Sequence, residues 1–253
     1  MPNIPKIKIN SLHKSFGGHV VLADINLDIK RDRSLVILGG SGTGKSVLIK
    51  TIIGLITPDS GSIIIDNVNT THMSKQTRFD IMKKCGFLFQ NGALFDSLTV
   101  QDNITFFAER LYQLSKNKKQ EIAVDKLESV GLSAKILNFF PAELSGGMQK
   151  RVAIARAICS NPEIIFFDEP TAGLDPIMAN IINELIVKIK TKLGATTITI
   201  THDLNSAGVI ADDVALIYQG RIIWYGSRAE MQDAKDPYLY QFIHGLTKGP
   251  IAY

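Results

Sequence analysis

The sequence has few cysteines and no long hydrophobic run. Its two cysteines, Cys85 and Cys159, form neither a CxxC pair nor a metal-spaced cluster, so we expect two buried thiols in a reducing cytosol. No stretch approaches the ~18 consecutive apolar residues that a membrane-spanning helix needs, and the N-terminus lacks the apolar run of a signal peptide. We therefore expect that the chain does not cross a membrane by itself.

A large excess of one charge is also absent. The 28 Lys and Arg residues nearly balance the 24 Asp and Glu residues, and the formal net charge of +4 is too small to argue for nucleic acid. With 45% hydrophobic residues, 20 glycines and 9 prolines among 253 residues, the composition excludes collagen-like, low-complexity and disordered chains. A chain of this length buries enough surface to fold without disulfides or a structural metal.

Two kinds of apolar pattern predict strands. Alternating apolar residues at 7 and 9 and at 25, 27 and 29 predict strands with one face on a core. The continuously apolar segments 35–38 and 164–167 predict strands buried on both faces of a parallel sheet. Further strands are expected at residues 63–65, 196–200, 214–217 and 222–225, the last two flanking a turn at Gln219 and Gly220.

Helical spacing dominates the middle of the chain from Thr99, where Thr99 and Asp102 indicate a capping box. The basic stretch 115–120 is interpreted as a solvated loop, and residues from about 95 to 160 as a helical insert in an α/β domain. Apolar stripes then predict a helix that packs on the sheet and a short helix in the tail. These stripes are Met178, Ile182, Leu185 and Ile189, and Leu239, Phe242, Ile243 and Leu246.

A glycine-rich motif follows the first fully apolar strand. It fits the pattern G-x-x-x-x-G-K-[ST] and consists of Gly39, Gly40, Ser41, Gly42, Thr43, Gly44, Lys45 and Ser46. The glycines let backbone N–H groups turn toward phosphate oxygens, and the helix that follows adds the positive end of its dipole. Lys45 can reach the β- and γ-phosphates of a nucleotide, and the Ser46 hydroxyl can bind Mg²⁺. The alternative is a flexible glycine turn, which the preceding strand and the following helix disfavour.

The second fully apolar strand ends in two acids, Asp168 and Glu169. Buried carboxylates are costly unless they are paired or lie near a cation. Asp168 can hold Mg²⁺, and Glu169 can act as the general base that polarises an attacking water. Alone, the pair could be an ordinary feature between a strand and a loop, but the phosphate loop upstream favours a catalytic role.

A third motif, Leu144-Ser145-Gly146-Gly147-Met148, opens an amphipathic helix. Ser145 is a good helix cap, and the N–H groups of Gly146 and Gly147 make a second anion site at a helix N-terminus. By itself this motif is only a helix cap. Together with the phosphate loop and the acidic pair, in this order, it makes the chain resemble the nucleotide-binding subunit of ABC transporters.

The resemblance implies an α/β architecture, the P-loop NTPase fold of ABC ATPases, with an antiparallel β subdomain and a helical subdomain. It implies a single domain over residues 1–253, with the helical subdomain at about 95–160 and a tail at about 236–253. It also implies a cofactor pair of ATP and Mg²⁺ and a head-to-tail dimer in which two copies of the chain enclose two ATP molecules. Each ATP would then touch Ser145 of the opposite copy.

The same resemblance assigns further residues to the nucleotide. Phe16 stands where the family places an aromatic that stacks on adenine, and His202 looks like the switch histidine that contacts the γ-phosphate. Gln90 looks like the glutamine that contacts Mg²⁺, as Ser46 and Asp168 are expected to do. Asp175, in a segment similar to the D-loop, and Val47, which follows the phosphate loop, complete the expected nucleotide contacts. The family's Gln is replaced by Met148, which should matter little, because Ser145 and the glycine amides face the phosphate.

A narrower resemblance concerns residues 90–100 and the tail, which are similar to the Mla-type lipid-transport ATPases that serve MCE-protein transporters. It implies a permease that moves phospholipid between inner and outer membranes, an MCE-domain protein and a small STAS-domain partner. The chain would then be a peripheral protein on the cytoplasmic face of a bacterial inner membrane. Leu94 and Phe95 would line the groove for the permease, or would pack internally. The tail could likewise reach the other subunit or cap its own domain.

Two other functions fit the same motifs. One is a non-transport ABC ATPase of iron–sulfur cluster assembly, which is also a single soluble domain. The other is an ABC ATPase that powers the transport of a different substrate. ABC ATPases of chromosome maintenance are disfavoured, because they need a long coiled coil between the phosphate loop and Ser145.

Overall fold

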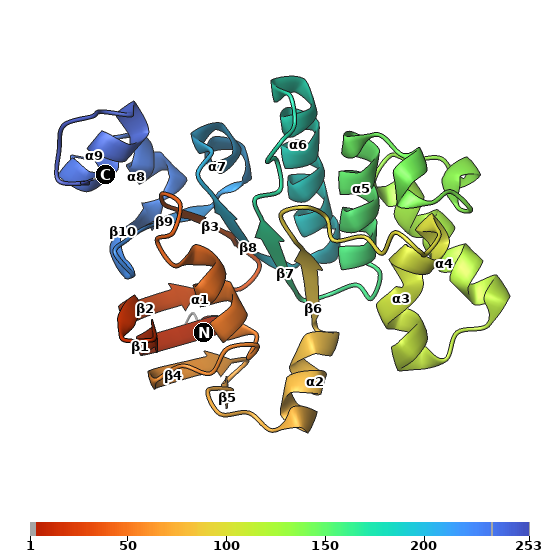
Figure 1. The fold of residues 1–253 in the computed structure, drawn as a ribbon, viewed down its shortest axis with the longest axis horizontal. Helices are drawn as coiled ribbons and strands as arrows, with labels where there is room; N and C mark the ends of the chain where they lie inside the picture. The colour runs from red at the N-terminus through yellow and green to blue at the C-terminus, as the bar shows by residue number, and fades with distance from the viewer. Residues whose placement is uncertain (1–3, 234, 253) are drawn as a thin grey trace. The chain divides into compact units, whose positions relative to one another are not determined.

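The two ends of the chain fold together. In the computed structural model, which describes residues 4–233 and 235–252, one unit contains the described residues before 83 and after 195, and a second unit contains residues 83–195. The first unit includes the red, orange and blue parts of Figure 1, and the second includes its yellow, green and teal parts. Within the described residues, no helix combines the length and apolarity that are needed to cross a membrane.

An antiparallel sheet forms one part of the first unit. The predicted alternation is confirmed: the apolar residues at 7, 9, 25, 27 and 29 are buried, and the polar residues at 8, 26 and 28 are exposed. In sheet order, the strands are β2 (His19–Ile29), β1 (Ile7–Phe16), β4 (Ser60–Ile65) and β5 (Val68–Asn69).

A second set of strands in this unit carries the phosphate loop. Its central strand is buried along its whole length and pairs in parallel with a neighbour on each side, which confirms the prediction for residues 35–38. The predicted turn at Gln219 and Gly220 is also confirmed, with both residues at positive φ. In order, the strands are β10 (Arg221–Ser227), β9 (Asp213–Tyr218), β3 (Ser34–Leu38) and β8 (Thr196–Thr201).

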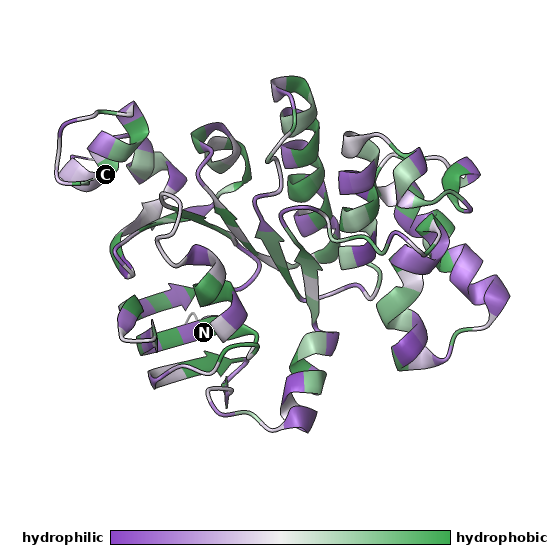
Figure 2. Ribbon diagram, viewed as in Figure 1, coloured by the Kyte–Doolittle hydropathy of each residue, from purple (hydrophilic) through white to green (hydrophobic). Residues whose placement is uncertain are grey.

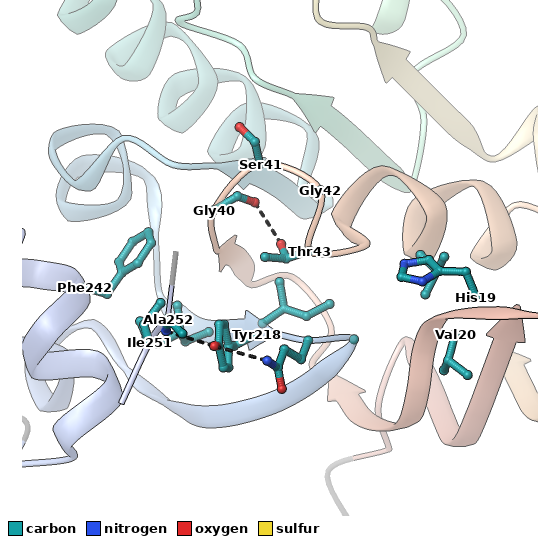
Figure 3. Close-up of a pocket in the computed structure, with 15 residues that line it drawn as sticks. His19, Val20, Gly40, Ser41, Gly42, Thr43, Tyr218, Phe242, Ile251 and Ala252 are labelled. Carbon is teal, nitrogen blue, oxygen red and sulfur yellow. Dashed lines mark hydrogen bonds between the residues drawn. The ribbon is translucent and has the colours of Figure 1, made fainter. Parts of the chain in front are cut away.

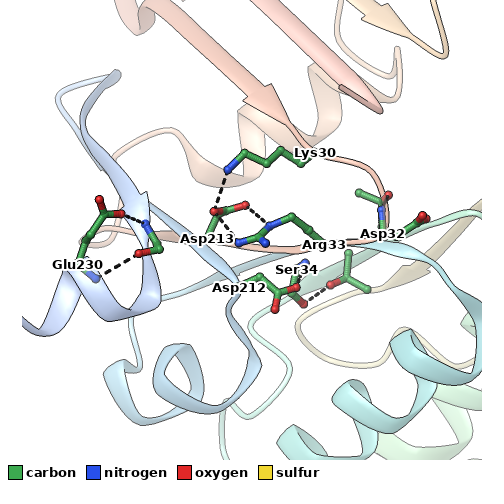
Figure 4. A network of polar contacts seen from close by, with 10 residues as sticks. Lys30, Asp32, Arg33, Ser34, Asp212, Asp213 and Glu230 are labelled. Carbon is green, nitrogen blue, oxygen red and sulfur yellow. Dashed lines mark hydrogen bonds and ion pairs between the residues drawn. The ribbon is translucent and has the colours of Figure 1, made fainter. Parts of the chain in front are cut away.

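A polar network ties the start of β3 to the start of β9 (Figure 4). Arg33 Nε and Nη2 donate to the Asp213 carboxylate at 2.7 and 2.9 Å, and Lys30 Nζ donates to it at 3.2 Å. Next to it, the backbone N–H of Ser34 donates to Asp212 at 2.8 Å. Because Asp213 is only 3% exposed, its charge depends on these donors.

The helices of the first unit are short, and one of them, α2, leads into the second unit. They are α1 (Lys45–Ile52), α2 (Lys75–Lys83), α7 (Leu204–Ile210), α8 (Arg228–Gln232) and α9 (Pro237–His244).

The second unit combines two parallel strands with helices. The strands are mostly green, and therefore hydrophobic, in Figure 2, and the predicted strand at 164–167 is confirmed as fully buried. The elements are β6 (Cys85–Leu88), α3 (Val100–Tyr112), α4 (Lys116–Ser129), the 3₁₀ turns η1 (Ala134–Ile136) and η2 (Pro141–Glu143), α5 (Gly146–Ala157), β7 (Ile164–Asp168) and α6 (Pro176–Leu193).

The prediction of a loop at residues 115–120 is wrong, because these residues cap and begin α4, but the predicted solvent exposure is confirmed for all of them except the half-buried Lys119. Ser115 accepts a hydrogen bond from the Lys118 N–H, as a helix N-cap does. The lysines that follow are good helix formers, and Lys119 Nζ lies 2.9 Å from both Asp102 and Glu109 of α3. One lysine of the basic run is therefore paired with acids on a neighbouring helix.

The start of α3 agrees with the prediction only in part. Thr99 is the N-cap and accepts the Asp102 N–H at 3.2 Å, as expected. The Asp102 carboxylate, however, accepts the Thr99 hydroxyl at 2.8 Å and the Lys119 ammonium at 2.9 Å, instead of completing the backbone pairing of a capping box. An aspartate is one methylene shorter than the glutamate that usually makes that pairing.

The tail also differs from the predicted stripe. Leu239 is buried, but Leu246 lies beyond the end of α9 and is 44% exposed. The buried polar residue is Gln241, whose side chain accepts the Ile251 N–H at 2.7 Å and donates to the Ile251 carbonyl at 3.1 Å. The segment after α9 is thus folded back on the helix by one amide side chain.

Candidate active site

The phosphate-loop motif of the first unit lies between β3 and α1, as the pattern predicts. Lys45 is buried, and its Nζ donates to the carbonyl oxygens of Gly39 and Gly40 at 2.7 and 2.8 Å. Thr43 Oγ1 donates to the Gly40 carbonyl at 2.9 Å. The loop therefore curves around its own ammonium group, and Ser46 lies exposed in the first turn of α1 beside the half-buried Val47.

Two positions of this loop require glycine. At Gly39, a Cβ would lie 2.6 Å from the carbonyl oxygen of Ile217 in β9. At Gly44, φ is +100°, and a Cβ would lie 2.8 Å from the carbonyl oxygen of Val21 in β2. At both ends of the loop, a side chain would thus clash with the backbone of a neighbouring strand.

A cavity of about 460 Å³ borders the loop, within the range of small-molecule sites (Figure 3). Residues Gly40 to Thr43 form one side of it, and Val20 and Val21 of β2 form another. The folded-back tail closes a third side with Phe242, Ile251 and Ala252, whose N–H donates to the Tyr218 hydroxyl at 3.0 Å. The phosphate loop therefore borders an apolar pocket within its own unit.

Phe16 and His202 lie in the same unit as the loop. Phe16 ends β1 with 47% of its surface exposed, and the Lys14 ammonium lies 5.2 Å from the centre of its ring. His202 is exposed and directly follows β8, where Thr201 pairs in register with Leu38 of β3. His202 and Gly39 thus leave adjacent parallel strands at the same edge, where α/β proteins bind their ligands.

The acidic pair and Gln90 lie in the second unit. Leu88 of β6 pairs in register with Phe167 of β7, so the segments with Gln90 and with Asp168 and Glu169 leave the two strands at one edge. Glu169 is 9% exposed and has a φ of +46°, a left-handed conformation that is uncommon outside glycine. Residues held in this conformation cluster at functional sites.

A buried lysine joins these groups, and the sequence reasoning missed it. Lys150 of α5 is 6% exposed, and its Nζ donates to the backbone carbonyl of Gln90 at 2.6 Å. Burial lowers the pKa of Lys150, and the negative charges of Asp168 and Glu169 oppose that shift. The only signal in the sequence is a basic residue within the helix that follows Ser145.

The third motif forms the predicted helix cap. Ser145 is the N-cap of α5, and its Oγ accepts the N–H of Met148 at 3.3 Å, which leaves its O–H able to donate to an anion. Gly146 is exposed, and Gly147 is buried, where a Cβ would lie 3.0 Å from Met178 of α6. Because Met148 takes part in the cap through its backbone, the unusual side chain leaves the cap intact.

Asp175 is exposed and acts as the N-cap of α6. Its Oδ1 accepts the backbone N–H groups of Ile177 and Met178 at 3.0 and 2.9 Å. The expected site residues therefore fall into two groups. The first unit holds Phe16, residues 39–47 and His202, and the second holds Gln90, residues 145–147, Asp168, Glu169 and Asp175.

A comparison with known families decides the identity of this architecture. A family model described as ABC transporter matches residues 22–172, which include the phosphate loop, the Ser145 motif and the acidic pair. The chain belongs to the ABC transporter family. The resemblance inferred from the sequence is confirmed, and with it the ABC ATPase fold, ATP binding and ATPase activity.

Relatives of this ABC protein cover nearly its whole length. It is 37% identical to the probable ribonucleotide transport ATP-binding protein mkl of Mycobacterium leprae, over 99% of this chain and 72% of that protein. It is 35% identical to the intermembrane phospholipid transport system ATP-binding protein MlaF of Haemophilus influenzae, over 98% of this chain and 93% of that protein. Among solved structures, the dimeric cassette MJ0796 bound to ADP and Pi is 31% identical, with a TM-score of 0.80, over 88% of this chain and 98% of that one.

Proposed function

We propose that this chain is the ATP-hydrolysing subunit of a transporter that moves phospholipid between the inner and outer membranes of a bacterium. The observation that carries the proposal is the similarity to MlaF, which extends over 98% of this chain and 93% of that protein. The alternative with specific support is transport of a ribonucleotide, the activity named for the mycobacterial relative, of which the chain covers 72%.

The residues of the first unit are proposed to bind the nucleotide. The Lys45 ammonium, held inside the phosphate loop by two carbonyls, would turn to the β- and γ-phosphates, and the loop N–H groups would donate to their oxygens. The exposed Phe16 ring offers a flat face for adenine. His202, at the same edge of the strands as the loop, would donate to the γ-phosphate.

The side chains expected to bind magnesium carry oxygen donors that suit this ion. Ser46, Gln90 and Asp168 offer a hydroxyl, an amide and a carboxylate oxygen, which are the hard ligands that Mg²⁺ prefers. When bound, the ion would neutralise charge on the phosphates during the reaction. These three residues are therefore proposed as the magnesium ligands of the chain.

Glu169 is proposed as the general base. It follows β7 directly, and its left-handed backbone and 9% exposure hold the carboxylate in a restricted setting. It would accept a proton from the water that attacks the γ-phosphate, a role that contributes about 10²- to 10⁴-fold to a rate. Replacing it by glutamine keeps the shape and removes the base.

A second copy of the chain is proposed to complete the site. The N-terminus of α5, with the Ser145 hydroxyl and the N–H groups of Gly146 and Gly147, is a second anion site in a chain that already has a phosphate loop. In a head-to-tail dimer, it would bind the nucleotide of the opposite copy, with Asp175 near the seam. The dimeric form of the MJ0796 cassette supports this arrangement.

The membrane partners are proposed from the relatives and from one surface. We infer a permease in the inner membrane, with this chain on its cytoplasmic face, together with an MCE-domain protein and a STAS-domain protein. Phe95 is 42% exposed while its ring contacts Phe106 at 4.4 Å between centroids, so it offers an apolar contact on a fixed support. Such a surface suits a helix of the permease.

The ATPase assignments are tested with two variants of the full-length chain. Glu169→Gln should bind ATP normally and hydrolyse it about 10²-fold or more slowly, whereas Lys45→Ala should weaken ATP binding itself. Binding is measured by titration calorimetry, and hydrolysis is measured by phosphate release. Near-normal turnover in Glu169→Gln would contradict the general-base role, and unchanged affinity in Lys45→Ala would contradict the phosphate-loop role.

The substrate is tested by purification. The chain, tagged and expressed in its bacterium, is isolated with its partners from membranes, and mass spectrometry identifies the proteins and the bound small molecules. The proposal expects a permease, an MCE-domain protein and bound phospholipid. A complex that lacks lipid and carries ribonucleotide would favour the alternative, and a complex without any membrane protein would contradict transport.

A further inference from the structure

Helix α5 holds the segment that contains Gln90 along one of its faces. Lys150 Nζ donates to the Gln90 carbonyl at 2.6 Å, and the Arg156 guanidinium donates to the carbonyls of Gly92 and Ala93 at 2.5 and 2.7 Å. Between them, Ala153 lies beside Gly92, where an added Cβ would be in van der Waals contact with the Ala153 methyl group at 3.4 Å. Residues 150, 153 and 156 recur every three positions and so share one helix face.

Burying the Lys150 ammonium at this position is energetically unfavourable. Lys150 is 6% exposed, and a buried ammonium costs free energy unless charges and acceptors compensate it. The Gln90 carbonyl and the negative charges of Asp168 and Glu169 supply that compensation. An apolar side chain of similar volume would pack there without this requirement, so stability alone does not account for the lysine.

We propose that Lys150 is a positioning residue of the ATPase site, which acts by fixing the backbone of Gln90 against the helix that begins at Ser145. The inference rests on the proposed function, in which Gln90 contacts Mg²⁺ and Ser145 contacts a nucleotide. Because its carbonyl is hydrogen-bonded to α5, the backbone of Gln90 is fixed, and so is the point from which its side chain extends. A movement of the Ser145 helix is then passed to Gln90 through one hydrogen bond.

Three substitutions separate the donor from the bulk of the side chain. Lys150→Met keeps the approximate length of the side chain and removes the hydrogen-bond donor and the charge. Lys150→Arg keeps the donor and the charge. Lys150→Gln keeps a polar group, but it is shorter and neutral, so it serves as the second variant if the methionine disturbs folding. The matched control is Lys126→Met in α4, because Lys126 is also buried, at 8% exposure, and donates to the Asn161 side chain at 2.8 Å.

The full-length variants are assayed for kcat and KM of magnesium-ATP hydrolysis, for ATP affinity and for thermal unfolding. We expect Lys150→Met to lower kcat about 10- to 100-fold, since displacing a catalytic group by an ångström can cost that much, while ATP affinity stays within about threefold. Lys150→Gln should lie at least about threefold below the wild type in kcat, and Lys150→Arg should recover most of it. Lys126→Met should retain the wild-type kcat.

Specific results would overturn the inference. A kcat within about twofold of the wild type in Lys150→Met, or in Lys150→Gln if the methionine variant does not fold, would exclude a positioning role. An equal loss in Lys126→Met would show that any buried lysine of this unit has the same effect and would also exclude it. A wild-type chain that neither binds nor hydrolyses ATP would instead refute the proposed function, so the two failures are distinguishable.

Discussion

Replacing Asp213 by alanine should lower the free energy of unfolding by about 3 kcal/mol, because the substitution leaves two cations without their shared acceptor. Asp213 is 3% exposed at the start of β9 and accepts three hydrogen bonds. Two of these come from Arg33 and one from Lys30, both beside the start of β3 (Figure 4). The contact thus fixes the strand that leads directly into the phosphate loop.

The magnitude follows from the geometry. A hydrogen bond to a charged group contributes roughly 1.5–3 kcal/mol, so three of them give about 4.5–9 kcal/mol before any correction. The Lys30 and Arg33 side chains are 37% and 41% exposed, however, and would regain water once Asp213 is removed. This rehydration cancels half or more of the loss, which leaves about 3 kcal/mol. For a chain of this length, that corresponds to a fall in Tm of roughly 6–12 °C.

The measurement is urea and thermal unfolding of Asp213→Ala and of Arg33→Met, alone and combined. Because the two residues share one interaction, the double variant should lose less stability than the sum of the single losses, by about 1 kcal/mol or more. Asp28→Ala, which removes an exposed acid of β2, is the control and should change stability by less than about 0.5 kcal/mol. A loss below about 1 kcal/mol in Asp213→Ala, or additive losses, would refute the reasoning.

Two further predictions concern Asp59, which binds the end of β1, and Gly44 of the phosphate loop. Hydrogen bonds from Lys14 and Ser15 lower the pKa of Asp59 from 3.8 to about 2, so this carboxylate adds stability above its unfolded pKa and loses it as the pH falls through about 2. The stability difference between the wild type and Asp59→Asn, measured by urea unfolding, should therefore shrink between about pH 4 and pH 2, and a constant difference would contradict the assignment. Gly44→Ala should weaken ATP binding and destabilise the chain by about 1 kcal/mol or more, because its φ is +100° and a Cβ would meet the Val21 carbonyl at 2.8 Å. Calorimetric titration with ATP checks this, and wild-type affinity with unchanged stability would exclude the constraint.

Local patterns predicted the parts of the fold that local forces decide. The continuously apolar segment 35–38 became a fully buried strand, because every residue of such a strand faces a core. Thr99 and Ser145 became helix caps, since a hydroxyl oxygen can accept the N–H groups of a first helical turn. The turn at Gln219 and Gly220 formed because glycine adopts a positive φ without a steric penalty, as Gly220 does here.

The predictions that were wrong or incomplete have different physical causes. The lysines after Ser115 lie in a helix that Ser115 caps, and acids on α3 pair with Lys119. The strand Cys85–Leu88 was not predicted, since four residues carry too little periodicity to be distinguished from a loop. The tail stripe was assigned one residue too many, because α9 ends at His244 with Gly245 as a left-handed C-cap, so Leu246 lies beyond the helix.

The sequence by itself determined the chemistry of this protein. The phosphate loop, the acidic pair and the capped helix at Ser145 are each defined by a few consecutive residues, and their backbone geometry follows from glycine, from helix caps and from apolar runs. Only the tertiary structure decided which charged groups share a buried environment. Lys150 meets Gln90 across 60 positions and Arg33 meets Asp213 across 180, and such partners are chosen by burial, which exists only once the chain has folded.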